Sequence, residues 1–264
     1  MIRRLALAFQ FLTIIPWPRA VVRRPEDLGA SMAFYPVVGA VLGSILAGTY
    51  WIGAGLFPDG VLRPALVILL IICSGGLHMD GLADVCDGFY AGRTRADALR
   101  IMKDPHLGTM GVLGIVSVLV MKVTLLSFLP VMVLYTALMV TPAISRAGMV
   151  WGTRLGVYAR PDGGTGAIFF QTLRWRHVSL ATAFLGLWTL LCTGWPGVVL
   201  LVLAFVTTRL FVAVCHRRIG GMTGDTLGAL NELLELLTLV WYYPLLRWQI
   251  PPTPVINARF FFFS

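Results

Sequence analysis

Seven long apolar runs constrain the fold of this chain more than any other feature of its sequence. Each is long enough, or nearly so, to cross a hydrocarbon layer of about 30 Å, which takes roughly 20 residues of helix. Composition agrees, because 58% of the residues are hydrophobic and only 12% are charged, against about 25% charged in soluble domains. A soluble core of 264 residues cannot bury that much apolar surface. The sequence therefore excludes a soluble enzyme, a disordered chain and a disulfide-stapled secreted domain, and it predicts an all-α polytopic membrane protein.

The runs predict about seven transmembrane helices in a single membrane domain over residues 1–264. They cover residues 32–56, 62–77, 107–128, 131–151, 178–194, 198–215 and 227–246. A further apolar run over residues 5–15 is too short to cross, so we expect an N-terminal interfacial or re-entrant segment there.

The loops between these runs alternate in charge. Lysine and arginine concentrate in the N-terminal stretch and in the loops after the second, fourth and sixth runs, which seven crossings place on one side. That side is expected to be cytoplasmic, because basic residues accumulate in cytoplasmic loops. The net charge of +9 then needs no nucleic-acid partner, since no basic stripe with interleaved aromatic residues is present. Eleven of the twelve acidic residues, all but Asp59, fall on the same side, so we expect an active site at the cytoplasmic face.

An acidic stripe follows the second run, in the segment GGLHMDGLADVCDG. Asp80, Asp84 and Asp87 are spaced so that a helix would place their carboxylates close to one line. Such a stripe is self-repelling, and hard carboxylate oxygens suit Mg²⁺ or Mn²⁺. The alternative is a solvated acidic loop in which each aspartate caps a turn. Asp104 could complete the set, or could equally cap the helix that follows Pro105.

Basic and polar residues on the same side could bind phosphate. Lys103 precedes the third run, Arg146 lies in the last turns of the fourth, and Arg160 follows it. The turn before the seventh run contains Thr223 and Asp225. Two acids then enter the apolar run itself, Glu232 and Glu235, beside Asn231. These acids could bind a second cation or a substrate hydroxyl, or could pair between helices. Arg209 could be their buried counter-charge, or its side chain could snorkel to the membrane interface.

Together these segments resemble the cobalamin synthase family, whose members are also called adenosylcobinamide-GDP ribazoletransferases. The resemblance is carried by GGLHMDGLADVCDG, IMKDPHLGTMG, SRAGM and GGMTGDTLGA, and it runs over about residues 5–246. It implies a Mg²⁺-dependent enzyme of the bacterial inner membrane. Its substrates would be adenosylcobinamide-GDP and α-ribazole, or the 5′-phosphate of α-ribazole, and it would release GMP.

Charge and spacing, taken together with this resemblance, predict roles for individual residues. The metal ligands would be Asp80, Asp84, Asp87 and Asp104. The catalytic carboxylates would be Asp84, Asp104 and Asp225, one of which would act as the base. The substrate contacts would be His78, Lys103, Arg146, Arg160, Thr223, Asn231 and Glu232.

Two other functions remain open at this point. A membrane phosphotransferase of the CDP-alcohol type also uses spaced aspartates, but its pattern requires an Ala-Arg pair where this chain has Ala83 and Asp84. An ion-coupled transporter would place its acids near the membrane midplane, whereas most acids here precede or follow the apolar runs. The sequence also allows a homo-oligomer, and the lipid bilayer is an expected partner.

Overall fold

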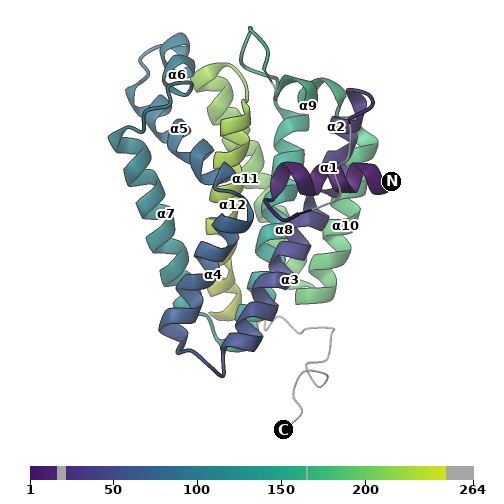
Figure 1. The fold of residues 1–264 in the computed structure, drawn as a ribbon, viewed down its shortest axis with the longest axis vertical. Coiled ribbons are helices and arrows are strands. Elements are labelled where there is room, and N and C mark those ends of the chain that lie inside the picture. The colour runs from purple at the N-terminus through teal and green to yellow at the C-terminus, as the bar shows by residue number, and fades with distance from the viewer. Residues whose placement is uncertain (17–21, 165, 248–264) are drawn as a thin grey trace.

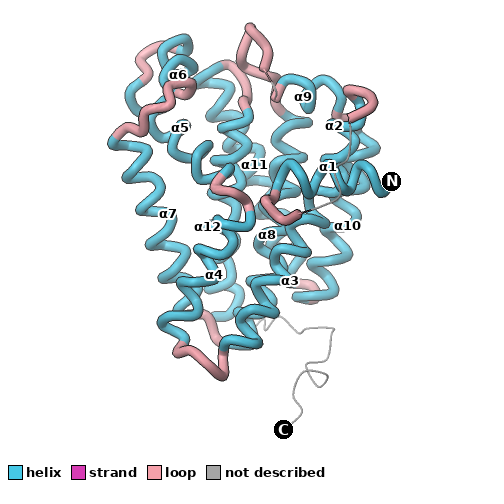
Figure 2. Tube along the Cα trace, in the orientation of Figure 1, coloured by secondary structure: helices cyan, strands magenta, loops and turns pink. Residues whose placement is uncertain are grey.

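The computed structural model describes residues 1–16, 22–164 and 166–247, and these residues fold almost entirely into helices (Figures 1 and 2). The only β-pairing within them is an isolated bridge between Tyr158 and Met222. The predicted all-α class is therefore confirmed. The helices are α1 (Ile2–Leu12), α2 (Glu26–Ser31), η1 (Met32–Phe34), α3 (Tyr35–Gly53), α4 (Asp59–Cys73), α5 (Leu77–Ala91), α6 (Arg95–Ile101), α7 (Thr109–Phe128), α8 (Val131–Leu155), α9 (Ala167–Thr172), α10 (Trp175–Thr193), α11 (Pro196–Ile219) and α12 (Gly224–Arg247).

Four of these stretches are long and apolar enough to cross a membrane by themselves: Glu26–Gly53, Thr109–Phe128, Val131–Leu155 and Pro196–Ile219. α4 and α5 meet the same criteria only as a pair, and the two helices meet at 89°. By length and composition, the described residues therefore contain four or five candidate spans. The prediction of one domain over residues 1–264 includes residues 248–264, which lie outside the described part.

The second predicted span is wrong at its end. We expected it to continue to Leu77, but α4 ends at Cys73. Gly75 and Gly76 follow with φ of 62° and 71°, a left-handed conformation that glycine adopts at little cost. Leu77 then begins α5, which turns away from α4. The three aspartates of the acidic stripe consequently lie on a separate short helix.

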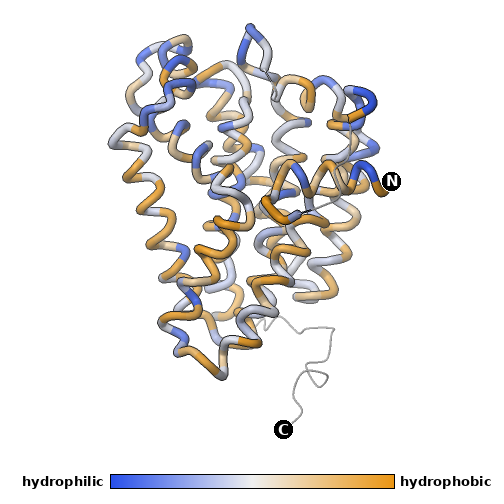
Figure 3. Tube along the Cα trace, in the orientation of Figure 1, coloured by the Kyte–Doolittle hydropathy of each residue, from blue (hydrophilic) through white to orange (hydrophobic). Residues whose placement is uncertain are grey.

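The loops gather at two ends of the bundle. The segments around α2, α6 and α9 lie at one end, and the α3–α4 and α7–α8 turns lie at the other (Figure 1). Figure 3 shows hydrophilic residues concentrated at the first end and hydrophobic residues along the long helices. α1 lies across the long helices, with Leu7, Phe9 and Leu12 buried. We call the end with α2, α6 and α9 the polar end.

Glycines allow α3 and α8 to pack closely. A Cβ atom at Gly39 or Gly43 would collide with the α8 backbone, at Pro142 and Leu138 respectively. The Leu138 carbonyl lacks its usual helical partner because residue 142 is proline and has no N–H. Small residues four positions apart are a common device for close helix contact in membranes. The contact between α3 and α8 therefore depends on residues without side chains.

Arg63 joins two helices at the end of the bundle opposite the polar end. Its side chain is buried, and its guanidinium donates to the carbonyl oxygens of Leu126 and Leu129 at 2.7 Å each, at the end of α7. The same group pairs with Asp59 at 2.6 Å. A cation at a helix C-terminus satisfies carbonyls that have no partner within the helix. Arg63 thus joins the start of α4 to the end of α7.

The glycine contact generates a stability prediction. Gly43→Ala places a Cβ about 2.5 Å from the Leu138 carbonyl oxygen, and overpacking of this kind costs about 1–3 kcal/mol. Gly48→Ala is the matched control on α3, because no atom lies within 4 Å of its Cβ position. We expect Gly43→Ala to lower the Tm of the detergent-solubilised protein and Gly48→Ala to leave it unchanged or raise it. Equal Tm values would contradict the packing argument.

Candidate active site at the polar end

The candidate site forms where α5 crosses α12. A Cβ at Gly81 would lie 2.6 Å from the backbone oxygen of Asp225, and one at Gly228 would lie 3.3 Å from the backbone of His78. The absence of side chains at these two glycines lets the helices approach each other. As a result, acids from two segments far apart in the sequence come together.

Asp84 is the central acid of this crossing. Its carboxyl is half-buried, and within the described residues no donor binds it. Burial, and after it the negative charges of Asp225 and Asp80, raises the pKa of Asp84 to about 7. Asp80 itself is exposed. The site therefore contains more negative charge than its own residues neutralise.

Asp225 lies in the first turn of α12 and is the acid that Arg160 neutralises. The Arg160 guanidinium donates to the Asp225 carboxylate at 2.6 Å, and the Thr223 hydroxyl donates to the same oxygen at 3.2 Å. Thr223 also caps the helix, because its hydroxyl accepts the Thr226 N–H at 3.2 Å. Burial raises the pKa of Asp225, and the Arg160 charge opposes that rise. The 223–226 turn thus fixes one carboxylate and one guanidinium beside Asp84.

Asp87 has a different position from the other two acids of the stripe. Its carboxylate accepts the backbone N–H groups of Gly108 and Gly111 at 2.8 Å each. These amides lie at the start of α7, where N–H groups have no partner within the helix. Asp87 therefore connects α5 to α7, and its two oxygens are already engaged.

Asp104 and Lys103 lie in the loop before α7. Asp104 is exposed and accepts hydrogen bonds from the backbone and the ring of His106, which lower its pKa. Lys103 lies 3.6 Å from Asp162 in an exposed ion pair. Asp104 therefore closes a local turn with His106 and does not cap the following helix, because the N-cap of α7 is Gly108.

The donor chemistry at the crossing fits a hard divalent cation. Asp80, Asp84 and Asp225 offer carboxylate oxygens, and Asp80 and Asp84 accept no hydrogen bond within the described residues. Carboxylate oxygens are the ligands that Mg²⁺ prefers. In the described part of the chain, however, no three His, Cys, Asp or Glu side chains converge closely enough to hold a metal ion. The predicted set of Asp80, Asp84, Asp87 and Asp104 remains a prediction.

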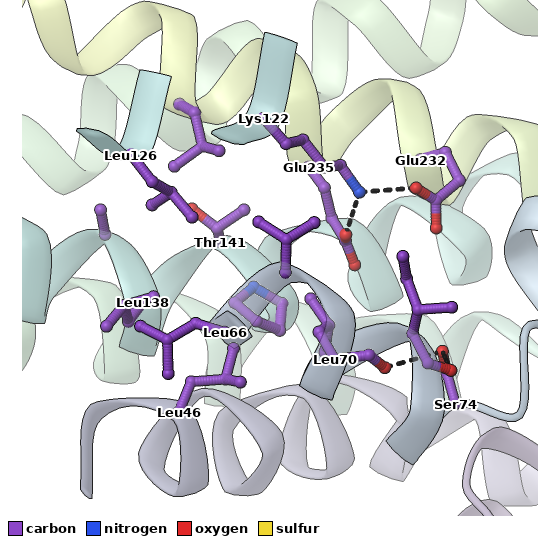
Figure 4. Close-up of a pocket in the computed structure, with 15 residues that line it drawn as sticks. Leu46, Leu66, Leu70, Ser74, Lys122, Leu126, Leu138, Thr141, Glu232 and Glu235 are labelled. Atoms are coloured by element: carbon purple, nitrogen blue, oxygen red, sulfur yellow. Dashed lines mark hydrogen bonds and ion pairs between the residues drawn. The ribbon is translucent and has the colours of Figure 1, made fainter. Parts of the chain in front are cut away.

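A second polar cluster lies deeper, between the long helices (Figure 4). Lys122 of α7 donates to Glu232 and to Glu235 of α12 at 2.5 Å each. On the other side, Glu235 pairs with Arg146 of α8. All four side chains are less than 5% exposed. Two cations and two anions therefore balance each other inside the bundle.

Several predicted substrate contacts belong to this deeper cluster. Asn231 donates to Glu235 at 3.1 Å, and Ser145 accepts from Arg146 at 3.0 Å. Both ring nitrogens of the buried His78 lack a partner in the described part of the chain. Apart from Asp87, Lys103 and Asp104, the structure thus divides the predicted site residues into two groups. Asp80, Asp84, Arg160, Thr223 and Asp225 meet at the helix crossing, whereas His78, Arg146, Asn231 and Glu232 lie in or beside the buried cluster.

Arg209 is not the counter-charge that we expected for the buried acids. It is exposed on α11 and forms no ion pair within the described residues. Lys122 has that role, and the sequence reasoning did not single it out. A lone lysine inside the run 107–128 was the available signal, since charges within apolar runs usually face a partner in the bundle.

A family comparison agrees with the resemblance seen in the sequence. The model of the family described as cobalamin-5-phosphate synthase matches residues 4–243. The chain belongs to this family. Its matched region includes both polar clusters and every helix from α2 to α11.

Curated relatives extend over the same length. A protein of Desulforamulus reducens is 40% identical, covering 95% of this chain and 99% of its own. One of Geotalea daltonii is 39% identical, covering 91% and 96%, and one of Acetivibrio thermocellus is 34% identical, covering 92% and 98%. All three are named adenosylcobinamide-GDP ribazoletransferase. No solved structure matches the chain.

The buried cluster generates a prediction for this family member. Lys122→Met leaves two buried carboxylates with Arg146 alone, and removing one partner of a buried ion pair costs about 3–5 kcal/mol. We expect a large loss of stability, measured by unfolding of the purified protein in SDS–detergent mixtures. Arg209→Met, on an exposed arginine of α11, is the control and should unfold like the wild type.

A double variant distinguishes charge imbalance from loss of packing. Lys122→Met combined with Glu232→Gln removes one cation and one anion together, so it should recover part of the lost stability. If the double variant is no more stable than Lys122→Met, the balance of charge is not what the cluster contributes.

Proposed function

We propose that this chain is an adenosylcobinamide-GDP ribazoletransferase that acts at the polar end of the bundle. It transfers the phosphate-linked adenosylcobinamide group from adenosylcobinamide-GDP to α-ribazole, or to α-ribazole 5′-phosphate, and releases GMP. The family match over residues 4–243 supports the reaction. The observation that supports the location is the convergence of Asp84 with the Asp225–Arg160 pair at the crossing of α5 and α12.

The reaction makes one bond and breaks one. A ribazole hydroxyl oxygen bonds to the phosphorus that bears the cobinamide group. The bond between that phosphorus and the oxygen bridging to GMP then breaks, and GMP leaves with the electron pair. Arg160 stabilises the negative charge that develops on the phosphate oxygens, because a guanidinium matches their geometry. Asp84, whose carboxylate no donor binds within the described residues, accepts the hydroxyl proton.

Mg²⁺ is the cofactor that we propose for this site. Asp80 and Asp84 would supply its protein ligands, since their carboxylate oxygens are the hard donors that the ion prefers and accept no hydrogen bond within the described residues. When bound, it neutralises charge on the diphosphate. The role of Lys103 would be to contact the phosphates from the loop before α7.

The membrane topology that we propose follows from the gathering of charged loops at the polar end. We propose seven crossings in the bacterial inner membrane with a cytoplasmic N-terminus, α10 and α12 being added to the candidate spans. The basic loops and the acid crossing then face the cytoplasm together. The four or five helices that pass on length and hydropathy support a membrane location.

The activity is tested with purified protein in lipid nanodiscs. Adenosylcobinamide-GDP, α-ribazole and Mg²⁺ are supplied, and the cobalamin product and GMP are separated by liquid chromatography. We expect both products in equal amounts, their loss with EDTA and their return with added Mg²⁺. Failure to form either product, with the 5′-phosphate of α-ribazole also supplied, would refute the proposal.

Asp84→Asn tests the central carboxylate. We expect kcat to fall roughly 10²-fold or more, because the variant removes a proton acceptor and a charged cation ligand. Glu26→Gln is the control, since Glu26 is exposed on α2 and forms no ion pair within the described residues. Tm should stay near the wild-type value in both variants. Normal turnover by Asp84→Asn at ordinary Mg²⁺ would remove Asp84 from the mechanism.

Orientation is tested by labelling single cysteines in whole cells. Gly60→Cys lies in the first turn of α4, and Arg93→Cys lies at the polar end. A membrane-impermeant thiol reagent should label the first in intact cells and the second only after the membrane is opened. Labelling of both from one side would overturn the proposed topology.

A further inference from the structure

A basic cavity lies beside the acid crossing. It has a volume of about 760 Å³ and lies between α6 and the segment that follows α8. Ligand cavities of this order hold molecules the size of a nucleotide. Its charged lining consists of four cations and one anion: Arg95, Arg100, Lys103, Arg160 and Asp162. The lining therefore suits a ligand with several negative charges.

Two of these cations are held in place by the protein. Arg95 donates to the backbone oxygen of Ala159 at 3.0 Å, and its guanidinium occupies the space above Gly220, which has no side chain. Arg160 is fixed by its pairing with Asp225 at 2.6 Å. These contacts position the two guanidinium groups before any ligand arrives, which lowers the entropy cost of binding.

The other two cations are free to reach a ligand. The Arg100 side chain is 74% exposed and lies 4.0 Å from Asp97, at the limit of an ion pair. Lys103 is half-exposed, and its partner Asp162 is 79% exposed. Exposed pairs of this kind contribute little stability, so a phosphate can replace them at low cost. The cavity thus combines fixed and adaptable positive groups.

The cavity and the acid crossing share one residue. Arg160 lines the cavity and also binds Asp225, next to Asp84. A molecule with phosphates in the cavity would therefore present its last phosphate to the carboxylates. Tyr158 adds an aromatic ring to the lining, which suits a flat base.

We propose that this cavity binds the nucleoside diphosphate part of the substrate and holds the nucleoside monophosphate product until release. The inference rests on the proposed function, since that reaction supplies a GDP-linked substrate. It adds Arg95, Arg100 and Tyr158 to the site and places the nucleotide on the α6 side of the carboxylates. A phospholipid headgroup is the other source of phosphate that could reach a basic cavity at the polar end.

The test measures binding of GDP to the full chain in nanodiscs of zwitterionic lipid, without Mg²⁺ and without the second substrate. Guanosine and inorganic phosphate are the comparison ligands. We expect GDP to bind more tightly than either of them. Arg100→Gln and Lys103→Gln should each weaken GDP binding by roughly tenfold, the effect of losing one charge-assisted hydrogen bond. Arg93→Gln removes a nearby exposed charge outside the cavity and should bind GDP like the wild type.

Kinetic and lipid measurements complete the test. In the transferase assay, Arg100→Gln should raise KM for the GDP-linked substrate more than it lowers kcat. If GDP affinity is the same in Arg100→Gln, Lys103→Gln and the wild type, the nucleotide does not bind here. If these variants bind GDP like the wild type but lose affinity for anionic phospholipid added to the nanodiscs, the cavity is a headgroup site and the inference is wrong. A wild type that binds GDP in this cavity but forms no cobalamin would refute the proposed function and leave only the nucleotide-binding part of this inference standing.

Discussion

The balance of charge around Glu235 is the interaction on which the middle of this structure depends. Water is scarce between apolar helices, so a carboxylate there requires cations close to it. Lys122 and Arg146 supply them from α7 and α8, and both contact Glu235 of α12. These ion pairs thereby fix the relative depth and the relative rotation of α7, α8 and α12. Since α5 crosses α12 through Gly81 and Gly228, the position of α12 also determines where Asp84 meets Asp225.

The same charge balance favours an enzyme over an ion-coupled transporter. A transporter needs acids that exchange cations within the membrane, and the structure does place two acids deep in the bundle. Both, however, are bound by Lys122, and Glu235 also by Arg146. Asp80 and Asp84 accept no hydrogen bond and form no ion pair within the described residues, and they lie on the helix that turns away at 89° towards the polar end. Carboxylates that lack a partner lie at that end, which is where a water-soluble diphosphate would arrive.

The sequence predicted the helices better than it predicted the contacts between them. Apolar length indicated α3, α7, α8, α10, α11 and α12, because each must bury or expose one continuous apolar surface. The spacing of Asp80, Asp84 and Asp87 correctly indicated a helix. It could not show that Asp87 would engage the amides of α7, because that contact joins residues 21 and 24 positions apart. The Gly75–Gly76 turn had a readable signal, but its effect, a bend rather than a longer span, depends on φ values that the sequence does not specify.

Polar residues therefore lie at two depths in the bundle, and the protein tolerates substitutions differently at each depth. At the deep level, the charged residues have buried partners, so substituting one of them leaves an unbalanced charge and lowers the stability of the fold. At the polar end, Asp84 is half-exposed and the cations of the α6 cavity face solvent. The fold therefore tolerates the same kind of substitution there, and the substitution weakens ligand binding instead. Arg160 lies between these levels, because it fixes Asp225 through a half-buried pair and also lines the cavity. Its loss would therefore disturb the geometry of the carboxylates and the binding of phosphate together, which neither Arg100 nor Lys103 can do.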